Sequence, residues 1–264
     1  MPPRTRRKIV IWIALLAATS ALAVWGASHL PGRFGAAGIC TVLAGAAFVA
    51  LYFLDMTVPG VNVFSKAVVR LPKGGNCVAL TFDDGPVEPF TRQILDVLDR
   101  FNAKATFFCL GENVERSPDL AREIVLRGHA LGNHSFSHRL LPSLKGADVS
   151  REIESTAQLM ERLTGARPKL FRCPKGYKSR SVARRVARAG HTLIGFSYPI
   201  YDVENPDASI LAERVLVRLR AGDIVLMHDG FSTRKPGSRD QLVKALPMIL
   251  EGIRARGITP VALS

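Results

Sequence analysis

Short apolar runs that are typical of β-strands alternate with helical stretches from Cys77 to the end of the chain, and this alternation limits the possible folds more than any other feature. Within the helical stretches, apolar residues recur at intervals of three and four, as in Ile94, Leu95, Leu98 and Phe101. The strand-like runs are Val78–Phe82, Ala105–Leu110, Ala130–Asn133, Leu170–Arg172, Leu193–Tyr198, Ile224–His228 and Thr259–Ala262. The alternation predicts an α/β domain whose parallel strands are joined by crossover helices, as an open sheet or as a barrel.

Polar side chains follow the ends of these predicted strands. They are Asp83 and Asp84 after the first strand, His134 after the third, Arg172 at the end of the fourth, Asp202 after the fifth and His228 at the end of the sixth. The carboxyl ends of parallel strands meet at one end of a sheet or barrel, which is where catalytic residues collect. We therefore expect these side chains to form one site.

The residue types in this group suit metal-assisted acid–base chemistry. Adjacent residues of a strand point to opposite sides, so Asp83 and Asp84 cannot act identically, and one can bind a metal while the other takes a proton. His134 and His138, four residues apart, can converge on the same ion. Two histidines and one carboxylate leave coordination positions open, as a catalytic metal site requires. The second aspartate and His228 suit the roles of base and acid.

Four segments resemble motifs of the polysaccharide deacetylases, the NodB-homology group or carbohydrate esterase family 4, which includes chitooligosaccharide deacetylases. Residues 81–86 (Thr-Phe-Asp-Asp-Gly-Pro) and 134–138 (His-Ser-Phe-Ser-His) are similar to the first two motifs. Residues 172–176 (Arg-Cys-Pro-Lys-Gly) resemble the third, and residues 226–229 (Leu-Met-His-Asp) the fifth. The resemblance implies a distorted (β/α) barrel of about seven parallel strands, and metal-dependent removal of an acyl group, acetyl or formyl, from N-acylated amino sugars of a polysaccharide, an oligosaccharide or a lipid-linked glycan.

The resemblance also implies a role for each matching residue. Asp83 would be the general base, oriented and charge-balanced by Arg172, and the metal ligands would be Asp84, His134 and His138. His228 would protonate the departing amine, with Asp202 as its partner. Leu226 would line the acyl-methyl pocket, and the backbone N–H of Lys175 would help to hold the oxyanion. Zinc is the default metal for such ligands, and cobalt, nickel or manganese could also serve.

The fourth motif departs from the family pattern. Asp202 is kept, but Val203 stands where tryptophan is usual, and Pro199 replaces an earlier aspartate. Lys175 also stands where an aromatic residue is common. These changes motivate an alternative, a catalytically impaired relative that binds carbohydrate or acts as a scaffold. Retention of the base, the three metal ligands, the arginine and the acid favours an enzyme.

Two long uncharged runs precede this domain. Residues 9–28 and 34–54 are each long enough to cross the roughly 30 Å of a bilayer core. We expect a transmembrane helical hairpin over residues 1–57, a linker over 58–76 and the deacetylase domain over 77–264. A cleaved signal peptide is the alternative for the first run, and a buried hairpin of a soluble fold is disfavoured because neither run has a polar face.

The basic residues around these runs predict how the chain crosses the membrane. Arg4, Arg6, Arg7 and Lys8 precede the first run, and only Arg33 lies between the two. The excess of positive charge predicts an inner-membrane, multi-pass protein with its N-terminus and its catalytic domain on the cytoplasmic side.

The remaining charges and thiols add expectations about partners. The net charge of +14 invites an anionic partner, but the basic residues are spread over several helices without a recognition motif, which disfavours nucleic acid. Arg180, Arg184 and Arg188 share one predicted helical face, which is either simply solvated or in contact with anionic membrane lipid. We expect His129 and His191 to be structural, and Cys109 and Cys173 to be buried thiols.

Overall fold

The computed structural model describes residues 18, 19, 21, 25, 26, 32–58, 60–72, 74–233 and 236–264. The chain divides into two compact units, Met1–Phe64 and Ser65–Ser264. The second unit begins inside the segment 58–76 that the sequence predicts to be a linker. Val68 forms a parallel bridge with Ile194, and Arg70 forms an antiparallel bridge with Asp223. The second half of that segment therefore packs against the domain that follows it.

The first unit contains one long apolar helix, α2 (Gly32–Thr57), which includes the predicted second span, residues 34–54. Within it, Cys40–Thr57 is long and apolar enough to cross a membrane, and apolar side chains such as Phe48 and Val49 are exposed. At the end of α2, the buried Asp55 accepts hydrogen bonds from the backbone N–H groups of Val63 and Phe64. The predicted first span, residues 9–28, lies almost wholly outside the described residues, so the hairpin stays a prediction.

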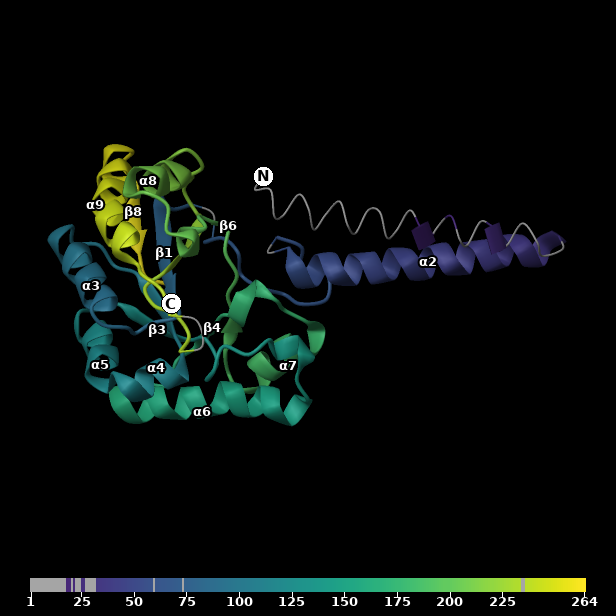
Figure 1. Cartoon of the computed structure of the whole chain (residues 1–264), viewed down its shortest axis with the longest axis horizontal. Coiled ribbons are helices and arrows are strands. Elements are labelled where there is room, and N and C mark those ends of the chain that lie inside the picture. The colour runs from purple at the N-terminus through teal and green to yellow at the C-terminus, as the bar shows by residue number, and fades with distance from the viewer. Residues whose placement is uncertain are drawn as a thin grey trace. The chain divides into compact units, whose positions relative to one another are not determined.

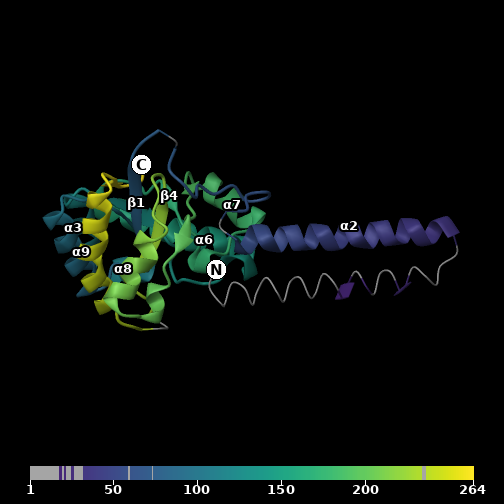
Figure 2. The same cartoon turned by 90° about the horizontal axis from the view of Figure 1, so that it is seen from above.

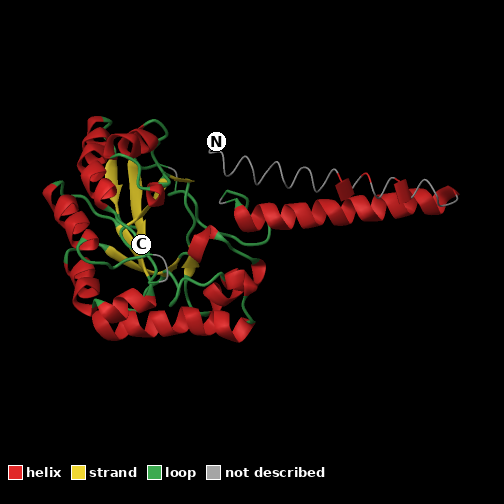
Figure 3. Cartoon of the chain, viewed as in Figure 1, coloured by secondary structure: helices red, strands yellow, loops and turns green. Residues whose placement is uncertain are grey.

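The second unit is a curled parallel sheet with helices on its outside (Figures 1 and 3). The strands are β1 (Cys77–Asp83), β2 (Thr106–Cys109), β3 (Ala130–Asn133), β4 (Leu170–Phe171), β5 (Thr192–Leu193), β6 (Tyr198–Pro199), β7 (Ile224–His228) and β8 (Thr259–Val261). Their order is β5-β4-β3-β2-β1-β7-β6, with β8 paired to β1, and all the pairs are parallel. This arrangement confirms the predicted distorted (β/α) barrel.

The helices of this unit bury one apolar face each. They are α3 (Phe90–Arg100), α4 (Gly111–Arg116), α5 (Pro118–Leu126), α6 (Gly146–Thr164), α7 (Arg180–Arg188), α8 (Ala208–Leu216) and α9 (Asp240–Ala255), with short 3₁₀ turns η1 (Leu141–Ser143), η2 (Pro174–Gly176) and η3 (Asp202–Glu204). In α3, the predicted positions Ile94, Leu95 and Leu98 are fully buried. Viewed from above, α3, α8 and α9 lie on one side of the unit, with α6 and α7 on the other (Figure 2).

The predicted fifth strand, residues 193–198, is instead two short strands that end the sheet on opposite sides. β5 pairs with β4, whereas β6 pairs with β7. β5 and β6 are the two edge strands of the curled sheet, and this segment connects them. One continuous strand could not pair with both β4 and β7. Ile194 leaves β5 to bridge Val68, and the Gly195 N–H donates to the Val68 carbonyl (2.7 Å). The segment between β5 and β6 is therefore the seam of the barrel.

Strand alternation decides which side chains face the barrel interior. In β1, Val78, Leu80 and Phe82 belong to the large core cluster that includes the buried faces of α3 and α9. Ala79 belongs to a separate cluster with Phe108 and Leu226. Thr81 and Asp83 continue the Ala79 side, so Asp83 points into the barrel and away from the helix-covered core.

Candidate active site

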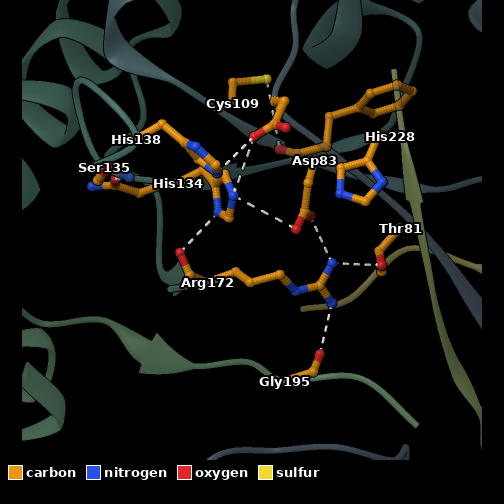
Figure 4. Close-up of polar contacts among 12 residues, drawn as sticks. Thr81, Asp83, Cys109, His134, Ser135, His138, Arg172, Gly195 and His228 are labelled. Atoms are coloured by element: carbon orange, nitrogen blue, oxygen red, sulfur yellow. Dashed lines mark hydrogen bonds and ion pairs between the residues drawn. The ribbon is translucent and has the colours of Figure 1, made fainter. Parts of the chain in front are cut away.

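The end of β1 sends two neighbouring carboxylates in different directions. Asp83 is the last residue of the strand and Asp84 follows it; both are buried. Asp84 has φ +72°, so the chain leaves the strand in the left-handed region at that residue. Asp83 lies against the guanidinium of Arg172 (Figure 4). Asp84 instead lies against His134 and His138. The predicted division of labour between the two aspartates therefore has a geometric basis.

Asp84, His134 and His138 form a compact group of possible metal ligands. Oδ1 of Asp84 lies 3.2 Å from Nε2 of His138 and 3.4 Å from Nε2 of His134. One ligand atom from each of the three lies within 4.8 Å of the others. His134 directly follows β3, the second neighbour of β1 in the sheet, and His138 is turned back by its own left-handed conformation, φ +56°. The two histidines thus converge on the Asp84 carboxylate, and their binding of one ion stays a prediction.

The hydrogen bonding of this group fits a divalent cation. Nδ1 of His134 lies 2.9 Å from the carbonyl oxygen of Arg172, which can only accept, so Nδ1 carries the proton and Nε2 presents a lone pair. Burial lowers the pKa of His134 to about 3, which keeps the imidazole neutral. Oδ1 of Asp84 is buried and has no hydrogen-bond partner among the described residues. A buried carboxylate oxygen beside an imidazole lone pair is a donor set suited to a metal.

Asp83 is paired with a fully buried arginine. Nη1 of Arg172 donates to Oδ1 of Asp83 (2.8 Å) and to the Thr81 hydroxyl (2.7 Å), and Nη2 donates to the Gly195 carbonyl (2.7 Å). The guanidinium also stacks 4.2 Å above the centre of the Phe108 ring. Burial raises the pKa of Asp83, and the positive charge of Arg172 opposes that rise. Arg172 therefore fixes the orientation of Asp83 and favours its ionised form.

His228 is held and charged by Asp202. Nδ1 of His228 donates to Oδ1 of Asp202 (2.9 Å), and the backbone N–H of His228 donates to Oδ2 (2.7 Å). Burial lowers the pKa of His228, but the charge of Asp202 and its hydrogen bond outweigh burial and raise the pKa to about 9. The imidazole is therefore protonated at neutral pH and can donate a proton.

The remaining residues of the predicted site lie around this group. Leu226 is in β7, buried, and faces Thr81 across the β1–β7 register. Lys175 lies in η2 with φ +59° and an exposed side chain, and Val203, in η3, is half exposed. Asp202 keeps its partner although the neighbouring tryptophan of the family pattern is missing. The acyl-pocket role of Leu226 and the oxyanion role of Lys175 stay predictions.

The residues expected to be structural have structural surroundings. The Ala105 N–H donates to Nδ1 of His129 (3.2 Å), and burial lowers the pKa of that histidine to about 4. His191 is also buried, and burial lowers its pKa. Cys109 and Cys173 are free, buried thiols, and burial raises the pKa of both. Neither histidine belongs to the group of possible metal ligands.

One buried acid that supports the site was missed from the sequence. Glu152 of α6 accepts hydrogen bonds from the backbone N–H groups of Phe136 (3.0 Å) and Ser137 (2.9 Å), and from the Ser137 hydroxyl (2.6 Å). It therefore holds the loop between the two histidines. The available signal was its position one turn from Val149 and Thr156, on the inward face of the helix. A charged side chain on a buried face is costly unless it is hydrogen-bonded, so its presence there indicates a partner.

Comparison with known proteins identifies similar chains and a similar fold. The family model described as polysaccharide deacetylase matches residues 70–194. A peptidoglycan-N-acetylglucosamine deacetylase of Bacillus cereus is 33% identical over 197 residues, covering 74% of this chain and 90% of the relative. A chitooligosaccharide deacetylase of Bradyrhizobium is 34% identical over 191 residues, which cover 70% of this chain and 87% of that relative. The crystal structure of the Bc1960 peptidoglycan N-acetylglucosamine deacetylase superposes with a TM-score of 0.71 at 32% identity, covering 75% of this chain and 91% of that one.

A parallel barrel that gathers a buried carboxylate, a histidine paired with an aspartate and a group of possible metal ligands at its carboxyl end is suited to hydrolysis. The chain belongs to the polysaccharide deacetylase family. It is accordingly a hydrolase that acts on carbon–nitrogen amide bonds.

Proposed function

We propose that this chain removes N-acyl groups, acetyl foremost, from amino sugars of a glycan. The observation that carries the proposal is the convergence of Asp83, His228 and the Asp84–His134–His138 group at one end of the barrel. The relatives reported above are named for deacetylating N-acetylglucosamine units of peptidoglycan and for acting on chitooligosaccharides. A polymer, an oligosaccharide and a lipid-linked glycan all present the same amide to this site.

The metal is the first element of the proposal. Asp84, His134 and His138 would hold a divalent ion, with zinc the first choice and cobalt, nickel or manganese as substitutes. When bound, such an ion supplies Lewis-acid polarisation of the amide carbonyl and lowers the pKa of water. The neutral state of His134 and the orphaned oxygen of Asp84 support this assignment.

Proton transfers by the chain's own residues make up the rest of the mechanism. Asp83, ionised and oriented by Arg172, takes the proton from the attacking water. The backbone N–H of Lys175 stabilises the oxyanion, and Leu226 contacts the acyl methyl group. His228, kept protonated by Asp202, gives its proton to the amine nitrogen as the carbon–nitrogen bond breaks. The products are a free amino sugar and a carboxylate.

Purified full-length chain tests the proposal directly. Incubated with zinc and a panel of N-acetylated and N-formylated chitooligosaccharides and peptidoglycan fragments, it should release acetate or formate and form free amines. The non-catalytic alternative, a carbohydrate-binding relative, predicts glycan binding without product. Retention of the three proposed metal ligands, the base, the arginine and the acid at one end of the barrel favours the enzyme.

We also propose that the catalytic unit is tethered to the cytoplasmic face of the inner membrane by two spans. The charge placement around residues 9–28 and 34–54 and the exposed apolar surface of α2 support this topology. The substrate would then be a cytoplasmic or inner-leaflet sugar. A C-terminal fusion to a phosphatase that is active only after export should be silent, and a cytoplasmic fluorescent fusion should emit. Strong phosphatase activity would place the domain outside.

A further inference from the structure

The segment that follows β2 carries none of the reacting groups, yet it lies between the two loops that carry the metal ligands. β2 pairs with β1 on one side and with β3 on the other. Residues 110–113 therefore emerge between the Asp83–Asp84 turn and the histidine loop. Leu110, Gly111 and Asn113 are all buried.

The backbone of this segment donates hydrogen bonds to both neighbouring loops. The Leu110 N–H donates to the Gly85 carbonyl (2.9 Å), next to Asp84. The Gly111 N–H donates to the Ser135 carbonyl (3.0 Å), and the Glu112 N–H to the Phe136 carbonyl (3.0 Å). A Cβ atom at Gly111 would lie 2.3 Å from the Phe136 ring, so only glycine permits this approach. The first turn of α4 is thus attached to both ligand loops.

Asn113 extends these attachments to a third loop. Its side chain is 4% exposed, and Nδ2 donates both to the Asp84 carbonyl (2.7 Å) and to the Phe231 carbonyl (3.1 Å). Phe231 lies three residues after His228. One amide group therefore connects the backbone of a metal ligand to the loop that follows the proposed acid.

The backbone of Asp84 needs such support. A non-glycine residue with φ +72° is in a sparsely populated conformation, which persists only when its surroundings hold it. The Asp84 carbonyl is also tightly packed, because a Cβ atom at Gly230 would lie 2.2 Å from it. The Asp84 carbonyl accepts its hydrogen bond from the Asn113 amide. Losing it would leave a buried, unpaired acceptor next to the ligand carboxylate.

We propose that Asn113 is a positioning residue of the metal site, which fixes the direction of the Asp84 carboxylate by holding the Asp84 carbonyl. The residue contacts none of the reacting groups and acts through Asp84. The inference rests on the metal role of Asp84 in the proposed function. It gives a function to residues 110–113, which lie outside the family motifs.

The test compares zinc affinity in matched variants of the full-length chain. Asn113→Ala should weaken zinc binding 10–100-fold, as removal of a group that orients a ligand usually does, measured by competition with a chromogenic chelator. Asn76→Ala is the control. Nδ2 of Asn76 also donates to a backbone carbonyl, that of Gly257 (2.7 Å), but Asn76 precedes the start of β1, at the opposite end of the strand from Asp84. Its zinc affinity should equal that of the wild type. Asn113→Leu, which has nearly the same shape and no hydrogen-bond donor, decides the matter if the alanine variant does not fold.

Each result separates the two claims. Weaker zinc binding in the Asn113 variants alone, with their metal-free thermal unfolding still cooperative, supports the positioning role. Unchanged zinc affinity in a folded Asn113 variant, or an equal loss in Asn76→Ala, would overturn it while the proposed function stands. A wild-type chain that binds no zinc would overturn both.

Discussion

Asp83 and His228 are direct partners in the register between β1 and β7, so the proposed base and acid lie side by side at the ends of adjacent parallel strands. Burial raises the pKa of Asp83, but the charged partner of each residue favours a different protonation state. Arg172 favours the carboxylate of Asp83, and Asp202 favours the imidazolium of His228. Two neighbouring groups that hold different charges at the same pH are what an acid–base pair requires.

Separate variants should distinguish proton transfer from metal binding. We expect Asp83→Asn to keep its zinc and to lose roughly 10²–10⁴-fold in activity, as loss of a general base does. His134→Ala should lose the zinc, because two ligands hold the ion poorly. Elemental analysis of the purified variants is the measurement. A zinc-free Asp83→Asn together with a loaded His134→Ala would reverse the two assignments.

The alkaline limb of the pH–rate profile should follow the protonation of His228. Its pKa of about 9 depends on the Asp202 carboxylate, so Asp202→Asn should lower that pKa and move the alkaline limb to lower pH, with the metal retained. Asp207→Asn, an acid five residues further along that precedes α8, is the control and should leave the limb in place. An unmoved limb in Asp202→Asn would show that Asp202 does not tune the acid.

Arg172→Met should act on both the acidic limb and stability. Without the guanidinium, the pKa of Asp83 rises further, so the acidic limb should move to higher pH. An acid whose pKa is raised in the folded state contributes stability in acid and loses it as the pH rises. We therefore expect a loss of about 3–5 kcal/mol in the free energy of unfolding at pH 8, for a buried charge left unpaired, and a smaller loss at pH 5. Urea unfolding at the two pH values checks this, and an equal loss at both would contradict it.

Glu152→Leu should destabilise the histidine loop. The substitution removes the acceptor of two backbone N–H groups and one hydroxyl, which costs about 1–3 kcal/mol for buried donors left unpaired. Glu154→Leu, two residues along the same helix, removes only partly exposed contacts with Arg167 (2.6 Å) and Gln158 (3.1 Å), and should cost roughly 0–1 kcal/mol. Chemical denaturation of both variants gives the comparison, and equal losses would argue against a special role for Glu152.

Metal binding should stabilise the fold through the three proposed ligands. Zinc at about 1,000 times its dissociation constant should raise the free energy of unfolding by ~4 kcal/mol, because it binds only the folded site. Removal by a chelator should reverse this gain. His138→Ala should show a reduced gain or none, whereas a variant of the structural His129 should keep it. A gain that survives His138→Ala would place the ion elsewhere.

The sequence predicts the reacting residues because they share a simple rule of position. Asp84, His134 and His228 each come at the end of a parallel strand, and the carboxyl ends of such strands meet. The supporting contacts follow no such rule. Glu152 reaches the histidine loop from α6, and Asn113 reaches Asp84 across 29 positions, so both contacts depend on how helices pack rather than on a position at a strand end.

The strand boundary at residues 193–198 was missed for a related reason. Its apolar residues are compatible with one strand, and the sequence does not reveal that the sheet curls until both its ends use this segment. The family resemblance implied a barrel, but not where it closes.

The seam between β5 and β6 links the closure of the barrel to the protonation state of Asp83, the proposed base. The Gly195 carbonyl lies in that seam and accepts a hydrogen bond from the Arg172 guanidinium, which in turn holds Asp83. A local opening of the seam would withdraw the counterion of the carboxylate while most of the core stayed folded. Gentle heating or mild denaturant should therefore silence the enzyme before the fold is lost, so that remaining turnover reports on the closure of the barrel rather than on its overall unfolding.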